Sequence, residues 1–129
     1  MVHYLSPEWL AEAEQAAKTA SGLAEATAGV SLSVQQVVTG GPHGDVTYHV
    51  HVRDGALSVS PGATDNPTVT FEQDYPTAVS VAKGELSAQG AFMTGRIRVR
   101  GDLPRLVEYQ EALSRVDDVF RTLRDRTQF

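Results

Sequence analysis

The chain has 129 residues, 41% of them hydrophobic and 21% charged, which leads us to expect a single globular domain over residues 1–129. Its formal net charge of −5 argues against nucleic acid as a partner, and the absence of cysteine excludes disulfides, thiolate catalysis and cysteine-rich zinc sites. No apolar stretch approaches the ~20 residues that cross a bilayer, and the N-terminus lacks the charged start of a signal peptide, so we expect a cytoplasmic location.

The N-terminal region predicts one long helix. Ser6, Pro7 and Glu8 have the features of a helix start, because serine caps, proline suits the first turn and an acid complements the helix dipole. Apolar residues then recur at helical spacing until the pattern ends near Gly29. The apolar stripe consists of Trp9, Leu10, Ala13, Ala16, Ala17, Ala20, Leu23 and Ala24.

Residues 30–72 predict four β-strands. Apolar and polar residues alternate with a period of two over residues 30–39, 46–53, 57–59 and 68–72. The intervening segments are rich in glycine and proline, and Asp54-Gly55 is a strong signal for a tight hairpin turn. We therefore expect an antiparallel meander with one apolar face.

The second half of the chain predicts helices around a last strand. Asp74 can cap a short helix that ends at Gly84, and residues 87–94 predict another short helix. Residues 96–100 alternate arginine with apolar residues, which predicts a fifth strand, and helical spacing follows over residues 102–123. This order of elements predicts an α+β layer structure.

Three runs of residues between Asn66 and Leu106 match a known pattern in type and spacing. They are Pro67-Thr68-Val69-Thr70-Phe71, Lys83-Gly84-Glu85-Leu86-Ser87 and Gly90-Ala91-Phe92-Met93-Thr94-Gly95-Arg96-Ile97-Arg98-Val99-Arg100-Gly101-Asp102. In these runs the chain resembles the sterol carrier protein 2 family, in which a short helix with an Ala-Phe-Met-like triplet leads to a last strand bounded by glycines. The upstream half is similar only in its order of elements.

The resemblance implies a fold and a function. The fold is a five-stranded, mostly antiparallel sheet covered on one face by helices, with an apolar tunnel between the layers. Family members bind sterols, fatty acids, acyl-CoA esters and other lipids, so the implied function is non-enzymatic binding and transfer of such ligands. The chain ends in Thr127-Gln128-Phe129 rather than a peroxisomal address, and it lacks the catalytic domain fused to some relatives, so neither that location nor that activity is expected.

The ligand site is expected around the short helices and the last strand. Phe92 and Met93 combine an aromatic ring with a flexible thioether, which suits either an irregular apolar ligand or an ordinary core. No charged residue interrupts the apolar faces of the predicted strands, so burial would hold the ligand, and we expect no cofactor, metal or catalytic residue. The predicted lining residues are Val79, Ala91, Phe92, Met93, Ile97, Val99, Leu103, Leu106 and Val107.

Other polar groups have simpler interpretations. His49 and His51 share one face of a strand and would need a third ligand to hold a metal, so we interpret them as polar residues of the outer sheet face. The glycine-rich loop at residues 40–45 lacks the lysine and following helix of a phosphate-binding loop. Asp117 and Asp118 lie on an amphipathic helix, and we interpret both as solvated surface.

Basic residues concentrate beyond residue 95, where eight arginines accompany six acids. Arg96, Arg98 and Arg100 project from the face of their strand opposite Ile97 and Val99. They form either a solvated face paired with neighbouring acids or a cationic strip that contacts an anionic membrane surface or the phosphates of acyl-CoA.

Two alternatives to a lipid carrier remain open from the sequence. A small isomerase or cyclase would need an ionisable group in its pocket, and Tyr48 is the only one at the inward strand positions. An interaction domain with a collapsed core would pack Phe92 and Met93 tightly. The apolar stripe over residues 116–123 has three open interpretations. It docks on the domain's own core, it forms a homodimer, or it covers the tunnel.

Overall fold

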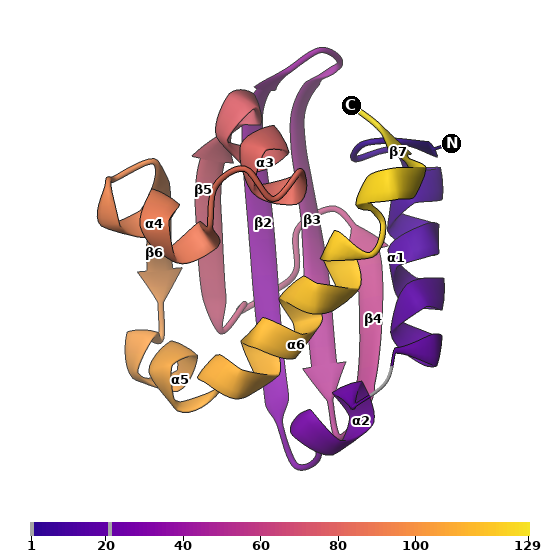
Figure 1. The fold of residues 1–129 in the computed structure, drawn as a ribbon. Coiled ribbons are helices and arrows are strands. Elements are labelled where there is room, and N and C mark those ends of the chain that lie inside the picture. Colours follow the sequence, from indigo (N-terminus) through magenta and orange to yellow (C-terminus); the bar gives the residue numbers. More distant parts are fainter. Residues whose placement is uncertain (1, 21) are drawn as a thin grey trace.

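The computed structural model describes residues 2–20 and 22–129, and its centre is a five-stranded sheet (Figure 1). The strand order is β4-β3-β2-β5-β6, and neighbouring strands are antiparallel except β2 and β5, which are parallel. The predicted α+β class with a mostly antiparallel sheet is confirmed. The strands are β2 (Ser31–Gly41), β3 (Gly44–Arg53), β4 (Ala56–Pro61), β5 (Val69–Asp74) and β6 (Ile97–Gly101).

The predicted four-strand meander is wrong at its last connection, because β5 pairs with β2 instead of β4. The connecting residues 62–68 cross the sheet, where the backbone N–H of Thr64 donates to Gln35 of β2 at 3.0 Å. The Thr64 hydroxyl lies 3.3 Å from Nε2 of His51 on β3. Seven extended residues span roughly 23 Å, and three strand spacings amount to about 14 Å, so the segment is long enough for this crossing.

Helices cover one face of the sheet, as expected (Figure 1). Helix α1 packs along β4 at the edge of the sheet, and α6 runs over the sheet and contacts α1 and α2. In the described part of the chain, no helix has the length and apolar character needed to cross a membrane. The helices are α1 (Pro7–Thr19), α2 (Leu23–Ala26), α3 (Tyr75–Ala82), α4 (Ala88–Met93), α5 (Leu103–Glu108), α6 (Gln110–Arg121) and the 3-10 turn η1 (Arg124–Arg126).

Side-chain caps confirm two predicted helix starts. The Ser6 hydroxyl accepts a hydrogen bond from the backbone N–H of Trp9 at 3.2 Å, and the Asp74 carboxylate accepts one from Thr77 at 2.9 Å. Each cap satisfies an N–H group that has no partner within its helix. The predicted starts of α1 and α3 therefore follow from local sequence alone.

The single N-terminal helix that the periodicity predicts is wrong in its continuity. Helix α1 ends at Thr19, and α2 begins after Gly22, whose φ of +79° is left-handed. This backbone conformation cannot continue a right-handed helix, and glycine adopts it without a steric penalty. Residue 21 falls within the predicted helix but lies outside the described residues.

The two ends of the chain lie together (Figure 1). β1 (Val2–His3) pairs in parallel with β7 (Thr127–Gln128), and the rings of Tyr4 and Phe129 lie 5.1 Å apart between their centroids. The sequence did not predict this pair, because two residues are too few for a strand periodicity.

The apolar stripe of α6 docks on the domain's own core. Val116, Val119 and Leu123 are buried, and Phe120 is half-buried against the same cluster. The stripe is therefore covered within one chain, and two of its residues, Val116 and Phe120, also line the cavity described below. A homodimer remains a prediction and would have to use another surface.

Candidate functional site

A cavity of ≈ 550 Å³ lies between the sheet and the helices. Inward-facing side chains of β2, β3, β5 and β6 form its floor, and α3, α4, α5 and α6 contribute its walls. The floor consists of Val34, Gln36, Tyr48, Val50, Phe71, Gln73, Ile97 and Val99. The helical wall includes Ala78, Val81, Ala82, Ala88, Gln89, Phe92, Met93, Leu106, Val107, Gln110, Leu113, Ser114, Val116, Asp117, Phe120 and Arg121.

The local sequence explains both the apolar wall and the open space. Because side chains alternate along a strand, Val34, Val50 and Phe71 face the helices. The opposing helices present Ala82 and Ala88, whose single methyl groups do not fill the gap. Small side chains at these two wall positions leave space where a fully interdigitated core would leave none.

Aromatic rings gather at one part of the wall. The indole of Trp9 meets Tyr4 and Tyr48 nearly at right angles, with centroids 5.0 Å and 5.9 Å apart. Phe120 of α6 lies 5.5 Å from Trp9. Edge-to-face pairs such as those of Trp9 with Tyr4 and Tyr48 favour a fixed arrangement of the rings.

A few polar groups interrupt the apolar wall. The side-chain amide of Gln73 donates to Gln36 at 2.8 Å, so these two glutamines satisfy each other on the cavity floor. Burial raises the pKa of the Asp117 carboxyl, although the Arg121 guanidinium, 3.3 Å away, acts in the opposite direction. Burial, and secondly the charge of Asp117, raise the pKa of the Tyr48 hydroxyl, so this phenol stays protonated. Together these groups can hydrogen-bond a polar group on an otherwise apolar ligand.

The interpretation of Asp117 and Asp118 as solvated surface is wrong for Asp117. Asp118 is exposed, whereas Asp117 is half-buried and lines the cavity. On α6, Leu113, Asp117 and Phe120 share a face at helical spacing, and that face looks into the cavity. The helix thus has two inward faces, one on the core and one on the cavity, and the sequence pattern showed only the first.

Six of the nine predicted lining residues lie on the cavity wall. They are Phe92, Met93, Ile97, Val99, Leu106 and Val107. Phe92 and Met93 are 49% and 75% exposed, so they are not part of a tightly packed core.

The structure places the other three predicted residues elsewhere. On α3 the cavity face is formed by Ala78, Val81 and Ala82, and Val79 lies off that stripe. Ala91 is completely buried in the packing of α4 and does not reach the cavity. Leu103 is the first residue of α5, one turn before Leu106 and Val107, and is 45% exposed.

Sequence reasoning missed much of the floor and the aromatic wall. Strand alternation carried a signal for Val34, Tyr48 and Phe71, because each occupies an inward position. For Trp9 and Phe120 the pattern indicated burial and nothing more, and only the packing of α1 against β4 and α6 brings them to the cavity.

The two histidines of β3 lie on the face opposite the cavity. Their rings are perpendicular, with centroids 5.0 Å apart. His49 Nδ1 lies 2.8 Å from the carbonyl oxygen of Gly62, and His51 contacts Thr64. No group of three potential metal ligands occurs among the described residues.

The strip of Arg96, Arg98 and Arg100 is exposed along β6. Arg100 forms an ion pair with Glu72 of β5 at 3.2 Å, which matches the solvated, acid-paired interpretation for that residue. Arg96 and Arg98 make no ion pair within the described part of the chain.

The fold and cavity define the chain as a small α+β domain with an apolar pocket under one helical layer. The model of the SCP-2 sterol transfer family matches residues 10–114, and the chain belongs to this family. Lipid binding is the general property of that family. A comparison with curated protein sequences finds no match.

Solved structures agree with this fold. The crystal structure of sterol carrier protein 2 superposes with a TM-score of 0.78 at 19% identity, covering 92% of this chain and 98% of that chain. A conserved hypothetical protein from Thermus thermophilus, described as possibly a sterol carrier protein, has a TM-score of 0.77 at 18% identity, covering 95% and 91% of the two chains. Palmitated SCP2L2 from Aedes aegypti has a TM-score of 0.56 at 18% identity, covering 79% and 92%.

Proposed function

We propose that the protein binds a lipid or another apolar small molecule in the cavity, in the cytoplasm, and releases it chemically unchanged. The observation that carries the proposal is the ≈ 550 Å³ cavity with its largely apolar wall. This volume lies within the range of about 300–1,000 Å³ common for small-molecule sites. Because one similar structure is described as palmitated, fatty acids are the first ligand class to test, followed by sterols and acyl-CoA esters.

Burial of a lipid chain supplies a gross free energy of the size that this function needs. Removing a dozen methylene groups from water contributes on the order of 10 kcal/mol before the entropic cost of binding. Micromolar affinity requires about 8 kcal/mol. Burial is therefore the main source of affinity, and the polar groups around Asp117 add to it and adjust selectivity.

We further propose that ligand exchange takes place at an anionic membrane surface through Arg96, Arg98 and Arg100. Met93 at the end of α4 and Leu103 at the start of α5 flank this strip and are 75% and 45% exposed. Exposed apolar side chains beside cationic ones suit the headgroup region of a bilayer. Replacing all three arginines with glutamine should reduce co-sedimentation with phosphatidylglycerol vesicles, and unchanged sedimentation would contradict this part of the proposal.

The decisive experiment is native mass spectrometry of freshly purified protein, followed by organic extraction of whatever has bound. A co-purifying lipid at near-stoichiometric occupancy is expected. A mass that stays unshifted after incubation with fatty acids and sterols would overturn the carrier function and favour an interaction domain.

One observation favours a second candidate, a small isomerase or cyclase. Asp117 is a carboxylate of raised pKa inside the cavity, beside the protonated Tyr48, as acid–base chemistry requires. Its ion pair with Arg121 fits a structural role equally well. Recovery of a bound compound that the protein converts, with conversion lost in Asp117→Asn, would establish this candidate instead.

A further inference from the structure

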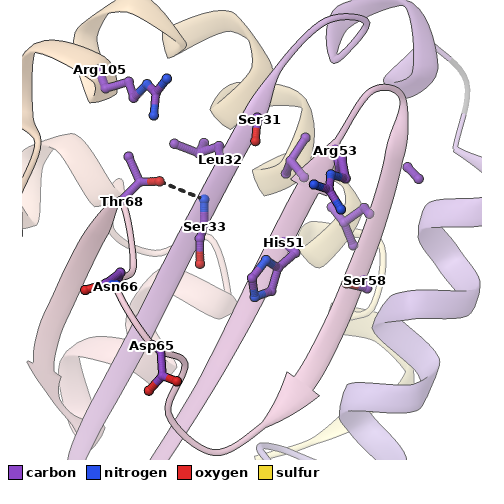
Figure 2. A pocket seen from close by; sticks show the side chains of 13 residues that line it. Ser31, Leu32, Ser33, His51, Arg53, Ser58, Asp65, Asn66, Thr68 and Arg105 are labelled. Carbon is purple, nitrogen blue, oxygen red and sulfur yellow. Dashed lines mark hydrogen bonds between the residues drawn. The ribbon is translucent and has the colours of Figure 1, made fainter.

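A second hollow, of ≈ 670 Å³, lies on the sheet face opposite the helices (Figure 2). Outward-facing residues of β2, β3 and β4 form its floor, among them Ser31, Ser33 and Ser58. The crossing segment with Asp65 and Thr68 forms one side. No described residue lines both this hollow and the lipid cavity, although α5 contributes Arg105 to the hollow and Leu106 and Val107 to the cavity.

Two arginines without acidic partners flank this hollow. Figure 2 shows the guanidinium groups of Arg53 and Arg105 on either side of β2, with Ser31 between them in this view. Within the described part of the chain, neither group has a carboxylate within 4.0 Å, whereas five other arginines do. Asp65 is the single acid among the described lining residues, so this hollow is positive in a chain whose net charge is −5.

Hydroxyl groups add further hydrogen-bond donors. The Ser33 hydroxyl is the one buried side-chain polar atom of the described residues that lacks a hydrogen-bond partner. Thr68 Oγ1 accepts a hydrogen bond from the backbone N–H of Ser33 at 3.0 Å, so its own hydrogen is available to another acceptor. Leaving a buried donor unpaired costs about 1–3 kcal/mol, and rotation about χ1 of Ser33 can turn its hydroxyl into the hollow.

We propose that this hollow binds a phosphate ester, with Arg53 and Arg105 contacting the phosphate oxygens. Phosphate accepts several hydrogen bonds at once and matches the planar donors of arginine. Asp65 disfavours a second anionic group and can accept hydrogen bonds from hydroxyl groups on the organic part. A soluble phosphorylated metabolite and a phospholipid headgroup share this chemistry.

Glycerol 3-phosphate, which both sources contain, is the probe for the first experiment. Amide chemical shifts of Ser33, Arg53 and Thr68 should move during its titration and stay unchanged with glycerol. Losing two charge-assisted contacts in Arg53→Gln/Arg105→Gln should weaken binding at least tenfold. The matched control is Arg115→Gln/Arg126→Gln, which removes the same charge from arginines paired with Asp118 and Glu12 and should bind as the wild type.

Vesicles distinguish the two sources. Phosphatidylcholine vesicles with and without phosphatidic acid are compared by co-sedimentation of the wild type and both double variants. Loss of phosphatidic acid binding in Arg53→Gln/Arg105→Gln alone assigns the hollow to a headgroup, and binding of glycerol 3-phosphate without vesicle binding assigns it to a soluble ester. Absence of binding to both probes, or equal weakening in the two double variants, overturns the proposal. Unchanged thermal melts of the variants show that they are folded, and the outcome therefore does not depend on the lipid carrier function.

Discussion

Truncating Phe92 should weaken lipid binding while leaving the fold intact. The ring lines the cavity and is 49% exposed, so a ligand can cover about half of its surface. Fully burying a phenylalanine side chain contributes about 1.5–3 kcal/mol, and half of that is about 0.8–1.5 kcal/mol. Phe92→Ala should therefore weaken binding about fourfold to twelvefold. Phe92→Asp adds a carboxylate that loses its hydration against the ligand, and a weakening of about 100-fold or more is expected.

Displacement of a fluorescent fatty acid measures these affinities, and thermal melts confirm that each variant is folded. Leu103→Ala and Leu103→Asp are the matched controls, because Leu103 is 45% exposed but does not line the cavity. The reasoning is refuted if folded Phe92→Asp binds as tightly as the wild type. Equal weakening by Leu103→Asp would show that surface charge, rather than the cavity wall, governs the affinity.

Three further changes test the packing and electrostatics of the cavity. Trp9→Ala removes a buried ring of the aromatic wall and should lower the free energy of unfolding in urea by about 3–5 kcal/mol, with Trp9→Phe costing much less. An alanine at Gly101, where φ is +114°, would collide with the carbonyl oxygen of Thr68, whereas an alanine at Gly95 meets open space. Gly101→Ala should therefore lower the free energy of unfolding by at least about 2 kcal/mol more than Gly95→Ala. Equal melting temperatures of the two variants would contradict this. The raised pKa of Asp117 means that the folded state takes up its proton more readily, so the contribution of Asp117 to stability should be greatest below the ordinary pKa of 3.8 and fall as the pH rises through the folded-state pKa. Asp117→Asn should flatten this part of a melting-temperature profile between about pH 3 and 7, and an unchanged profile would show that Asp117 is not its cause.

Local patterns predicted the elements well because their causes are local. The alternation that predicts β3 reflects only which side chains face the core, and the cap at Asp74 depends on residues within one turn. The parallel pairing of β5 with β2 has no such signature, since either neighbour would bury the same apolar face. Gly22 was equally ambiguous, because glycine is tolerated in a helical pattern and only its left-handed φ shows that the helix stops there.

The candidate site was predictable within the quoted family pattern and in the helix that follows it, where Leu106 and Val107 also line the cavity. Phe92, Ile97 and Val99 fall within that pattern and lie on the wall. Asp117 was missed because a helix over a cavity has a third kind of face, neither solvent nor core, which periodicity cannot separate from the other two. The hollow between Arg53 and Arg105 joins residues about fifty positions apart, and it exists only because the crossing segment lies over the sheet.

The pairing of β1 with β7 places both ends of the chain at one site on the domain. Because Tyr4 and Phe129 both line the cavity and touch each other, a reporter fused to either end sits beside the bound ligand. A short linker can join the two ends, and the exposed turn at Pro42-His43 can then supply new termini far along the chain. Such a circular permutant would keep every strand of the five-stranded sheet intact. A tag on its new termini would then lie away from Tyr4 and Phe129 and the cavity that they line.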